Sequence, residues 1–150
     1  MTATGHAVIG AIIAAKVGNP TLAIPLAVAS HVIADTIPHW DVGTNRGKKS
    51  RKSLIYNAMF DVLLGFFIAF LILGIFFPGT DPFYAIAIIL IAQSLDWITA
   101  PYYFFRITNP PFFLWTYKFQ KLFDQKLDRP WGIITQVIAV IALLVIAVKT

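Results

Sequence analysis

Cysteine and glutamate are both absent from this chain of 150 residues. The absence of cysteine excludes a disulfide framework, a thiolate metal ligand and a thiol nucleophile. All seven acidic residues are therefore aspartates, and charged residues make up only 13% of the chain, against about 25% in soluble domains. The sequence also lacks the G-x-S-x-G, P-loop and G-x-G-x-x-G motifs, which leaves a serine triad and nucleotide binding without support.

Apolar residues are abundant instead: 58% of the chain is hydrophobic and the mean hydropathy is +0.75. Several apolar runs approach or exceed the roughly 18–20 residues that cross a bilayer as a helix. We therefore expect one all-α domain over residues 1–150, a polytopic membrane helix bundle. The predicted transmembrane helices are 5–17, 21–37, 54–77, 83–105 and 131–148. Aromatic residues at helical spacing predict an interfacial amphipathic helix over 112–127, either lying on the membrane or packed as a lid over the bundle mouth.

Lysine and arginine are concentrated in two connectors. Five lie within 41–53 and five within 106–130, and Lys16 and Lys149 are the only others. The positive-inside rule places both connectors in the cytoplasm, so the N-terminus is expected to be cytoplasmic and the C-terminus outside. Anionic lipid explains the net charge of +5 better than nucleic acid does, and the expected partner is the lipid bilayer, with no nucleic acid.

The residues best suited to chemistry are concentrated in 30–41, SHVIADTIPHWD. His31 and Asp35 are four residues apart, which puts both side chains on one face of a helix. Pro38 should end that helix, so His39 and Asp41 are expected in the turn that follows. Imidazole nitrogens and carboxylate oxygens arranged in this way suit a divalent metal ion.

Further polar residues are expected at the same depth in the membrane as His31. Counted at about 1.5 Å per residue from the predicted cytoplasmic ends, His31, Asp61 and Asp96 all lie about 10–13 Å inside, and His6 starts its helix on that side. Charges in hydrocarbon are costly unless they share a counter-ion. We therefore predict a metal site, for zinc, manganese or iron, with the ligands His6, His31, Asp35, Asp61 and Asp96.

His39 and Asp41 are the predicted catalytic residues. A metal-activated water is the expected nucleophile, with an aspartate or His39 as its base. A site just inside the cytoplasmic lipid boundary suits a lipid or phosphorylated small-molecule substrate, cleaved at a phosphate or an ester.

Each candidate also has a structural interpretation, which the sequence leaves open. His6 can be an interfacial histidine, His31 and Asp35 a hydrogen-bonded pair between helices, and Asp96 part of a polar contact with its neighbours Gln93 and Ser94. The remaining alternatives are a helix cap with an aromatic anchor for 39–41, and a cap or a partner of the basic loop for Asp61. Elsewhere, Asp81 is expected in a turn, and Asp124 and Asp128 on a solvated face.

Two segments resemble a known family. The N-terminal MTATGHAVIGAIIAAK and the later SHVIADTIPHWD resemble bacterial inner-membrane proteins described as membrane-bound metal-dependent hydrolases. Members begin with a similar MTA-x-GH segment and carry an SHxxxD helix and a Pro-x-x-Asp turn. The resemblance covers about 41 residues, implies an inner-membrane hydrolase, and extends to His6, His31, Asp35, His39 and Asp41.

The chain departs from that family at one motif. Typical members have an HRG-x-THS segment with two further histidines, whereas this chain reads RGKKSRKSLIYNAMFD over 46–61 and has none there. Either Asp61 replaces that contribution or the site is incomplete. The alternative function is a non-enzymatic membrane protein whose buried histidines and aspartates pass ions or protons or lock helices together.

Overall fold

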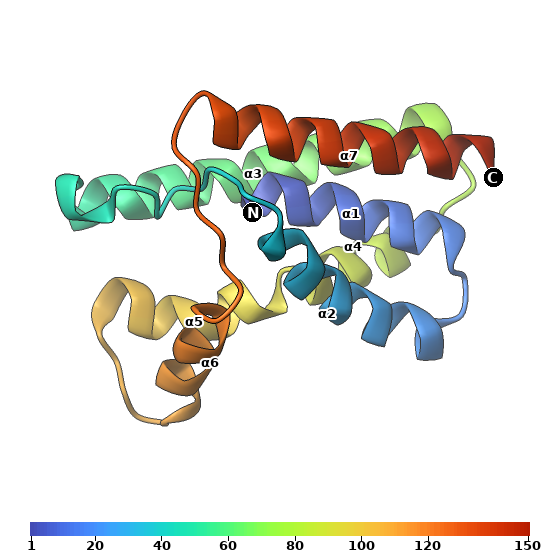
Figure 1. Ribbon diagram of the computed structural model, residues 1–150. Coiled ribbons are helices and arrows are strands. Elements are labelled where there is room, and N and C mark those ends of the chain that lie inside the picture. The colour runs from blue at the N-terminus through green and yellow to red at the C-terminus, as the bar shows by residue number, and fades with distance from the viewer.

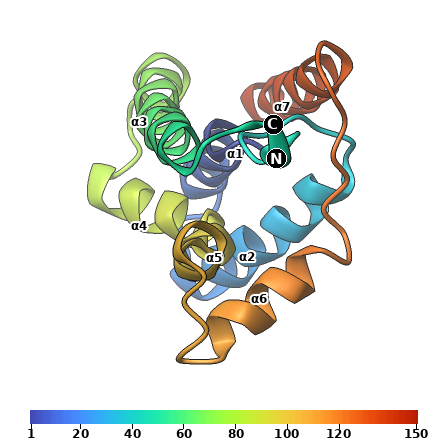
Figure 2. The same cartoon turned by 90° about the vertical axis from the view of Figure 1, so that its left-hand side faces the viewer.

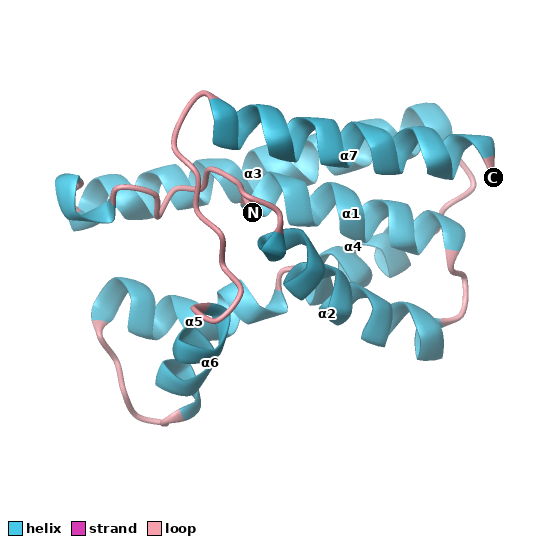
Figure 3. Cartoon of the chain, viewed as in Figure 1, coloured by secondary structure: helices cyan, strands magenta, loops and turns pink.

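The computed structural model describes residues 1–150 and is helical throughout, with no β-strand (Figures 1 and 3). The all-α prediction is therefore confirmed. The elements are α1 (Ala3–Lys16), α2 (Pro20–Thr36), the 3-10 turn η1 (Arg46–Lys48), α3 (Arg51–Phe76), α4 (Pro82–Ala92), α5 (Ser94–Phe105), α6 (Phe112–Gln120) and α7 (Trp131–Lys149).

Helix α1 lies at the centre of the molecule, between α2, α3, α4 and α7 (Figure 2). Every residue from Gly5 to Ala14 is buried, which explains why this helix has no polar face. Small residues let its neighbours approach closely. A Cβ added at Gly10 would lie 2.9 Å from the Cα of Ile89 in α4. At Gly65 of α3, an added Cβ would lie 3.0 Å from the Cα of Thr4.

Two helices, α3 and α7, are long and apolar enough to cross a membrane. Large apolar side chains on both are exposed, such as Phe67 at 67% and Ile138 at 62%, as expected of side chains that face lipid. Helices α4 and α5 count as a third span if the bent pair crosses as one. The sequence predicted five spans, and the structure supports two or three of them. Helices α1 and α2 have only 14 and 17 residues, fewer than the roughly 20 that a span needs.

The predicted fourth helix, 83–105, is divided at Gln93, where the axes of α4 and α5 differ by 50°. At this break the Asp96 N–H donates to the Gln93 carbonyl, 3.0 Å away. The Ala92 carbonyl instead accepts a hydrogen bond from Nδ1 of His31 at 2.7 Å. A side chain that inserts into the helical hydrogen-bond ladder is a common cause of a sharp bend.

Helix α6 ends at Gln120, whereas the sequence predicted a helix over 112–127. The residues that follow pair with the turn after α2 instead. The His39 N–H donates to the Gln125 carbonyl at 2.9 Å, and the Leu127 N–H donates to the His39 carbonyl at 2.7 Å. Pairing between segments more than 80 residues apart thus overrides the local helical periodicity. It also fixes the segment 121–127 beside His39.

The two basic connectors lie at the same end of the molecule, as Figure 1 shows. The turns at 17–19 and 77–81 and the C-terminus lie at the opposite end. In Figure 1, α1 begins and α2 ends near the middle of the molecule, on the side of the basic connectors. Asp35, in the last turn of α2, lines the same cavity as Lys121 and Lys126 of the second connector.

Candidate metal centre

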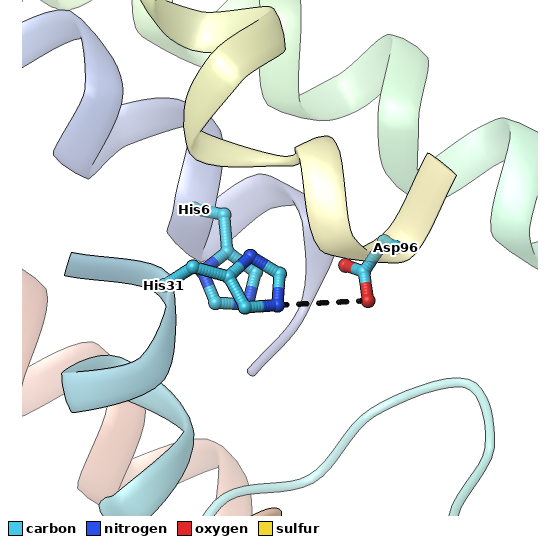
Figure 4. Close-up of side chains that lie close together, drawn as sticks. All are labelled: His6, His31 and Asp96. Atoms are coloured by element: carbon cyan, nitrogen blue, oxygen red, sulfur yellow. Dashed lines mark ion pairs between the residues drawn. The ribbon is translucent and has the colours of Figure 1, made fainter. Parts of the chain in front are cut away.

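Three helices bring His6, His31 and Asp96 together, as Figure 4 shows. The two imidazole rings are stacked in parallel, with centroids 3.9 Å apart and planes 5° apart. His31 Nε2 lies 3.7 Å from Asp96 Oδ1. One ligand atom from each residue lies within 4.8 Å of the other two. Both histidines are fully enclosed, with exposures of 1% and 0%, whereas the Asp96 side chain is 44% exposed.

Asp35 completes the group from the helix turn after His31. Its Oδ1 lies 3.2 Å from His6 Nε2, and its Oδ2 lies 3.5 Å from His31 Nε2. The amino nitrogen of Met1 also contacts Asp35 Oδ1 and lies 2.7 Å from His39 Nε2. The four-residue spacing therefore placed His31 and Asp35 correctly on one face. We call His6, His31, Asp35 and Asp96 the inner group.

The orientation of His31 is fixed by the bend between α4 and α5. Because a carbonyl only accepts hydrogen bonds, the nitrogen facing the Ala92 carbonyl must carry the hydrogen. In the neutral ring the other nitrogen, Nε2, then presents a lone pair to Asp35 and Asp96. Metal-bound histidines usually donate their second ring N–H to a carbonyl or carboxylate in this way. His31 is thus held as a metal ligand would be.

Two of the distances within the inner group are longer than direct hydrogen bonds. The separations of 3.5 and 3.7 Å from His31 Nε2 exceed the usual 2.7–3.2 Å or so of an N–H···O bond. Neither His6 Nε2 nor His31 Nε2 has a hydrogen-bond partner. Ligands about 2.0–2.2 Å from a tetrahedral ion lie about 3.3–3.6 Å from one another. Three separations, His6 to Asp35 and His31 to Asp35 and to Asp96, are 3.2–3.7 Å and lie close to that range, with Asp35 presenting a different oxygen to each histidine.

A second group, here called the outer group, is formed by His39, Asp41 and Asp124. His39 Nε2 lies 3.3 Å from Asp124 Oδ1, and its Nδ1 lies 2.8 Å from the Ile37 carbonyl. The Lys126 ammonium lies 2.6 Å from Asp41 Oδ2 and 3.4 Å from Asp124 Oδ2. Both carboxylates of this group are therefore already contacted by a cation, whereas in the inner group only Asp35 is, by the Met1 amino group.

Electrostatics in the outer group favour the charged forms of its members. Burial opposes ionisation of Asp124, but its hydrogen bond with His39 and the nearby Lys126 bring its pKa below the ordinary value. Burial likewise opposes the charge on Lys126, yet Asp41 and Asp124 raise the pKa of that ammonium. A divalent ion would have to compete with Lys126 for these carboxylates. The inner group is the better candidate for a metal.

Asp124 was missed by the sequence analysis, which expected it on a solvated face. Its side chain is only 15% exposed and faces His39. Helical periodicity beyond Gln120 misled that prediction, because the helix has ended there. The expectation of an exposed residue holds for Asp128, whose carboxylate accepts a hydrogen bond from Asn45 at 2.8 Å.

Asp61 was predicted to be a metal ligand, but its carboxylate contacts the start of α1 instead. Its Oδ2 accepts a hydrogen bond from the Ala3 N–H at 2.8 Å, and its Oδ1 accepts from the Thr4 hydroxyl at 2.7 Å. The carboxylate thus caps the N-terminus of α1 from the neighbouring α3, where a negative charge also suits the helix dipole. The structure brings the other four predicted ligands together and leaves Asp61 outside the inner group.

No protein-family model, curated protein or solved structure matches the chain. The assignment of a function therefore depends on the site and on the resemblance in the first 41 residues.

A cavity of about 380 Å³ lies beside both groups, between α3, α5, α6 and the segment 121–126. Carboxylates occupy one part of its wall: Asp35, Asp41, Asp61, Asp96 and Asp124. Apolar side chains of α3 form another part: Ile55, Ala58, Met59, Val62 and Leu63. The cavity therefore offers a polar, charged region beside the inner group and an apolar region along a helix that can cross the membrane.

Proposed function

We propose that the protein is a membrane-bound metal-dependent hydrolase. A divalent ion, zinc, manganese or iron, would be held by His6, His31, Asp35 and Asp96. The substrate would be a lipid-like molecule that carries a phosphate or an ester. The main support is the enclosure of two imidazoles beside two carboxylates, with His31 Nε2 at 3.5 and 3.7 Å from Asp35 and Asp96, longer than direct hydrogen bonds. When bound, such an ion supplies an acidified water and polarises the bond to be broken.

The protein's own residues have distinct roles in this proposal. His31 is oriented by the Ala92 carbonyl, and Asp35 holds both histidines from one carboxylate. His39 donates its Nδ1 hydrogen to the Ile37 carbonyl, so Nε2 carries the lone pair; it lies 2.7 Å from the Met1 amino nitrogen and would be the atom that takes a proton. Asp124, 3.3 Å away, would stabilise the imidazolium so formed. Asp41 binds Lys126 and the Thr44 hydroxyl, and so positions the charged side of the outer group.

The proposal includes a location and an orientation. We place the protein in the inner membrane, multi-pass, with both basic connectors and the N-terminus in the cytoplasm and the C-terminus outside. Support comes from the arrangement of the connectors at one end of the molecule, close to the site. Helices α1 and α2 would complete the five crossings. Leu22 and Ile33 of α2 are each 62% exposed, as lipid-facing side chains would be.

Metal content tests the proposal most directly. Elemental analysis of purified protein is expected to give stoichiometric divalent metal in the wild type and little or none in the His31→Ala and Asp35→Ala variants. Asp81→Asn is the matched control, because Asp81 caps α4 far from the site and asparagine caps equally well. A wild-type protein without metal would contradict the proposal.

Hydrolysis is a separate measurement. The metal-loaded wild type is expected to cleave model phosphodiesters or esters, and His39→Ala is expected to bind metal but turn over slowly.

The second candidate function is a non-enzymatic polar cluster that locks helices together or passes ions or protons. It is favoured by the contact of the Met1 amino group with Asp35, since this ammonium can balance the carboxylate without a metal. Absence of metal from the wild type would support this second function, and bound metal without any turnover would indicate a structural or transport site.

A further inference from the structure

Helix α5 presents a row of polar side chains to the cavity. Gln93 at its start, Asp96, Thr99 and Tyr103 are three or four residues apart, and all four line the cavity wall. Residues at this spacing lie along one face of a helix. Asp96 belongs to the inner group, but the other three have no role in the function proposed above.

Each of those three side chains has a buried polar atom without a partner. Gln93 Oε1, Thr99 Oγ1 and Tyr103 Oη make no hydrogen bond. Gln93 is only 1% exposed and Thr99 4% exposed. The amide nitrogen of Gln93 is occupied, since it donates to the Ala3 carbonyl at 2.9 Å, and this holds the oxygen in place. Buried polar atoms in folded proteins nearly always have partners. Three unpaired atoms on the wall of one cavity therefore indicate a polar ligand.

The opposite wall indicates an apolar part in the same ligand. Met59 and Leu63 of α3 line the cavity and are also 57% and 67% exposed on the outside of the molecule. Trp97 of α5, which lines the cavity too, is 44% exposed. The cavity edge is thus continuous with a surface that would face lipid. Its volume of about 380 Å³ is small for a binding site, so a long chain would have to extend out of it.

We propose that this face of α5 binds the phosphate-bearing head group of a membrane lipid that enters from the bilayer between α3 and α5. The Thr99 and Tyr103 hydroxyls would donate to phosphate oxygens, and Gln93 Oε1 would accept from a hydroxyl of the head group. Lys121 lines the same cavity and complements a negative charge, whereas Lys126 is already paired with Asp41 and Asp124. The acyl chain would lie along Met59 and Leu63. This assignment deepens the proposed function by naming the substrate class, and it rests on that function.

Binding can be measured without hydrolysis. Native mass spectrometry of the chelator-treated, detergent-purified protein would count adducts with dihexanoyl phosphatidic acid, dihexanoyl phosphatidylcholine or inorganic phosphate. We expect saturable binding of the phosphatidic acid and at least tenfold weaker binding in the double variant Thr99→Val, Tyr103→Phe. Tyr102→Phe is the matched control on the same helix, because Tyr102 does not line the cavity. Phosphatidylcholine also carries a phosphate but has no net charge, so its binding as tightly as phosphatidic acid would overturn recognition of a negatively charged head group.

Two further results distinguish the possibilities. Replacing unpaired hydroxyls by apolar groups of similar shape should leave the melting temperature unchanged or raise it, so a clear drop would show a structural role and overturn the proposal. Leu63→Trp, at the cavity edge, should weaken lipid binding but not phosphate binding. Equal binding of inorganic phosphate and lipid would exclude lateral entry. If the wild type contains metal but the double variant still binds lipid normally, the lipid-binding assignment is refuted and the hydrolase proposal is not. If the wild type binds lipid but contains no metal, only the hydrolase proposal is refuted.

Discussion

The two ring nitrogens of His31 face different chemical groups. Nδ1 is fixed by the Ala92 carbonyl, and Nε2 faces two carboxylates at distances too long for hydrogen bonds. His6 stacks on the same ring at 3.9 Å, so two protonated rings would repel each other strongly. At most one of the two histidines can be comfortably protonated, and a neutral imidazole is the form that binds a metal ion.

Asp61 and Asp35 should respond differently to removal. Asp61→Ala is expected to lower the free energy of unfolding by about 1–2 kcal/mol, because the cap of α1 is lost, and to leave the metal content unchanged. Asp35→Ala should abolish metal binding. Thermal unfolding in detergent and elemental analysis, applied to both variants, check this. Loss of metal from well-folded Asp61→Ala would show that Asp61 is a ligand after all.

Asp128 offers a test of pH dependence away from the site. Its hydrogen bond from Asn45 lowers the pKa of Asp128, with help from the Arg129 N–H. Its contribution to stability is therefore present above the ordinary pKa of an aspartate and is lost as the pH falls through the lowered one.

Asn45→Gly should raise the pKa of Asp128 towards the ordinary value. Glycine tolerates the backbone φ of 58° at this position, so the substitution removes the hydrogen bond without strain. NMR titration of the side-chain carboxyl carbon measures the change. An unaltered pKa would show that Asn45 is not its cause.

For individual residues, the sequence predicted the surroundings correctly only where the contacting residues are close in sequence. The pairing of His31 with Asp35 follows from their four-residue spacing, and Pro38 ended the helix about where expected. Asp61 and Asp124 depend on contacts with Ala3 and His39, which are 58 and 85 residues away in sequence. No local pattern encodes such a contact, so Asp124 was expected on a solvated face, and for Asp61 a cap was only the alternative to the predicted ligand role.

Among the elements, the break between α4 and α5 does most to shape the site. It releases the Ala92 carbonyl for His31 and directs Asp96 towards the same ring. The sequence showed polar residues at 93–96 inside an apolar run but predicted one continuous helix, because neither proline nor glycine marks the bend. The bend depends on a histidine from another helix, and the early end of α6 likewise depends on distant backbone pairing.

Close packing of α1 against α4 should matter for the metal site. In Gly10→Ala the new Cβ would lie 2.9 Å from the Ala92 Cβ, so α4 must move together with the carbonyl that orients His31. We expect a loss of about 1–3 kcal/mol in stability and weaker metal binding. Gly74→Ala is the control, because an added Cβ there meets no atom within 4 Å. Equal metal affinity in both variants would disprove the link between this contact and the site.

The whole molecule places its positive charge at one end. Ten of its twelve lysines and arginines lie in the two connectors, which Figure 1 shows close together. The tendency to be helical and the charge bias were readable from composition, because they are sums over many residues. The number of membrane spans could not be read from the sequence. Helix α1 is buried inside the protein, and it is therefore as apolar as a helix that contacts lipid.

The absence of cysteine makes the orientation directly testable. Gly47, in a basic connector, and Gly79, in the turn between α3 and α4, both have open space around an added Cβ. In intact cells, a membrane-impermeant maleimide should label Gly79→Cys and should label Gly47→Cys only after the membrane is permeabilised. Labelling of both variants in intact cells would contradict the proposed orientation.

The start of α7 has a consequence for the order of assembly during synthesis. Gly132 packs on the turn after α2, its carbonyl accepts from the Trp40 N–H at 3.0 Å, and Gln136 donates to the Trp40 carbonyl at 3.1 Å. An emerging chain can bring the inner group together once α5 has been made. His39 must wait for Asp124 and for the last helix. Under the proposed function, metal loading and competence for proton transfer would therefore be separate steps in maturation, and the second would begin only once α7 is in place.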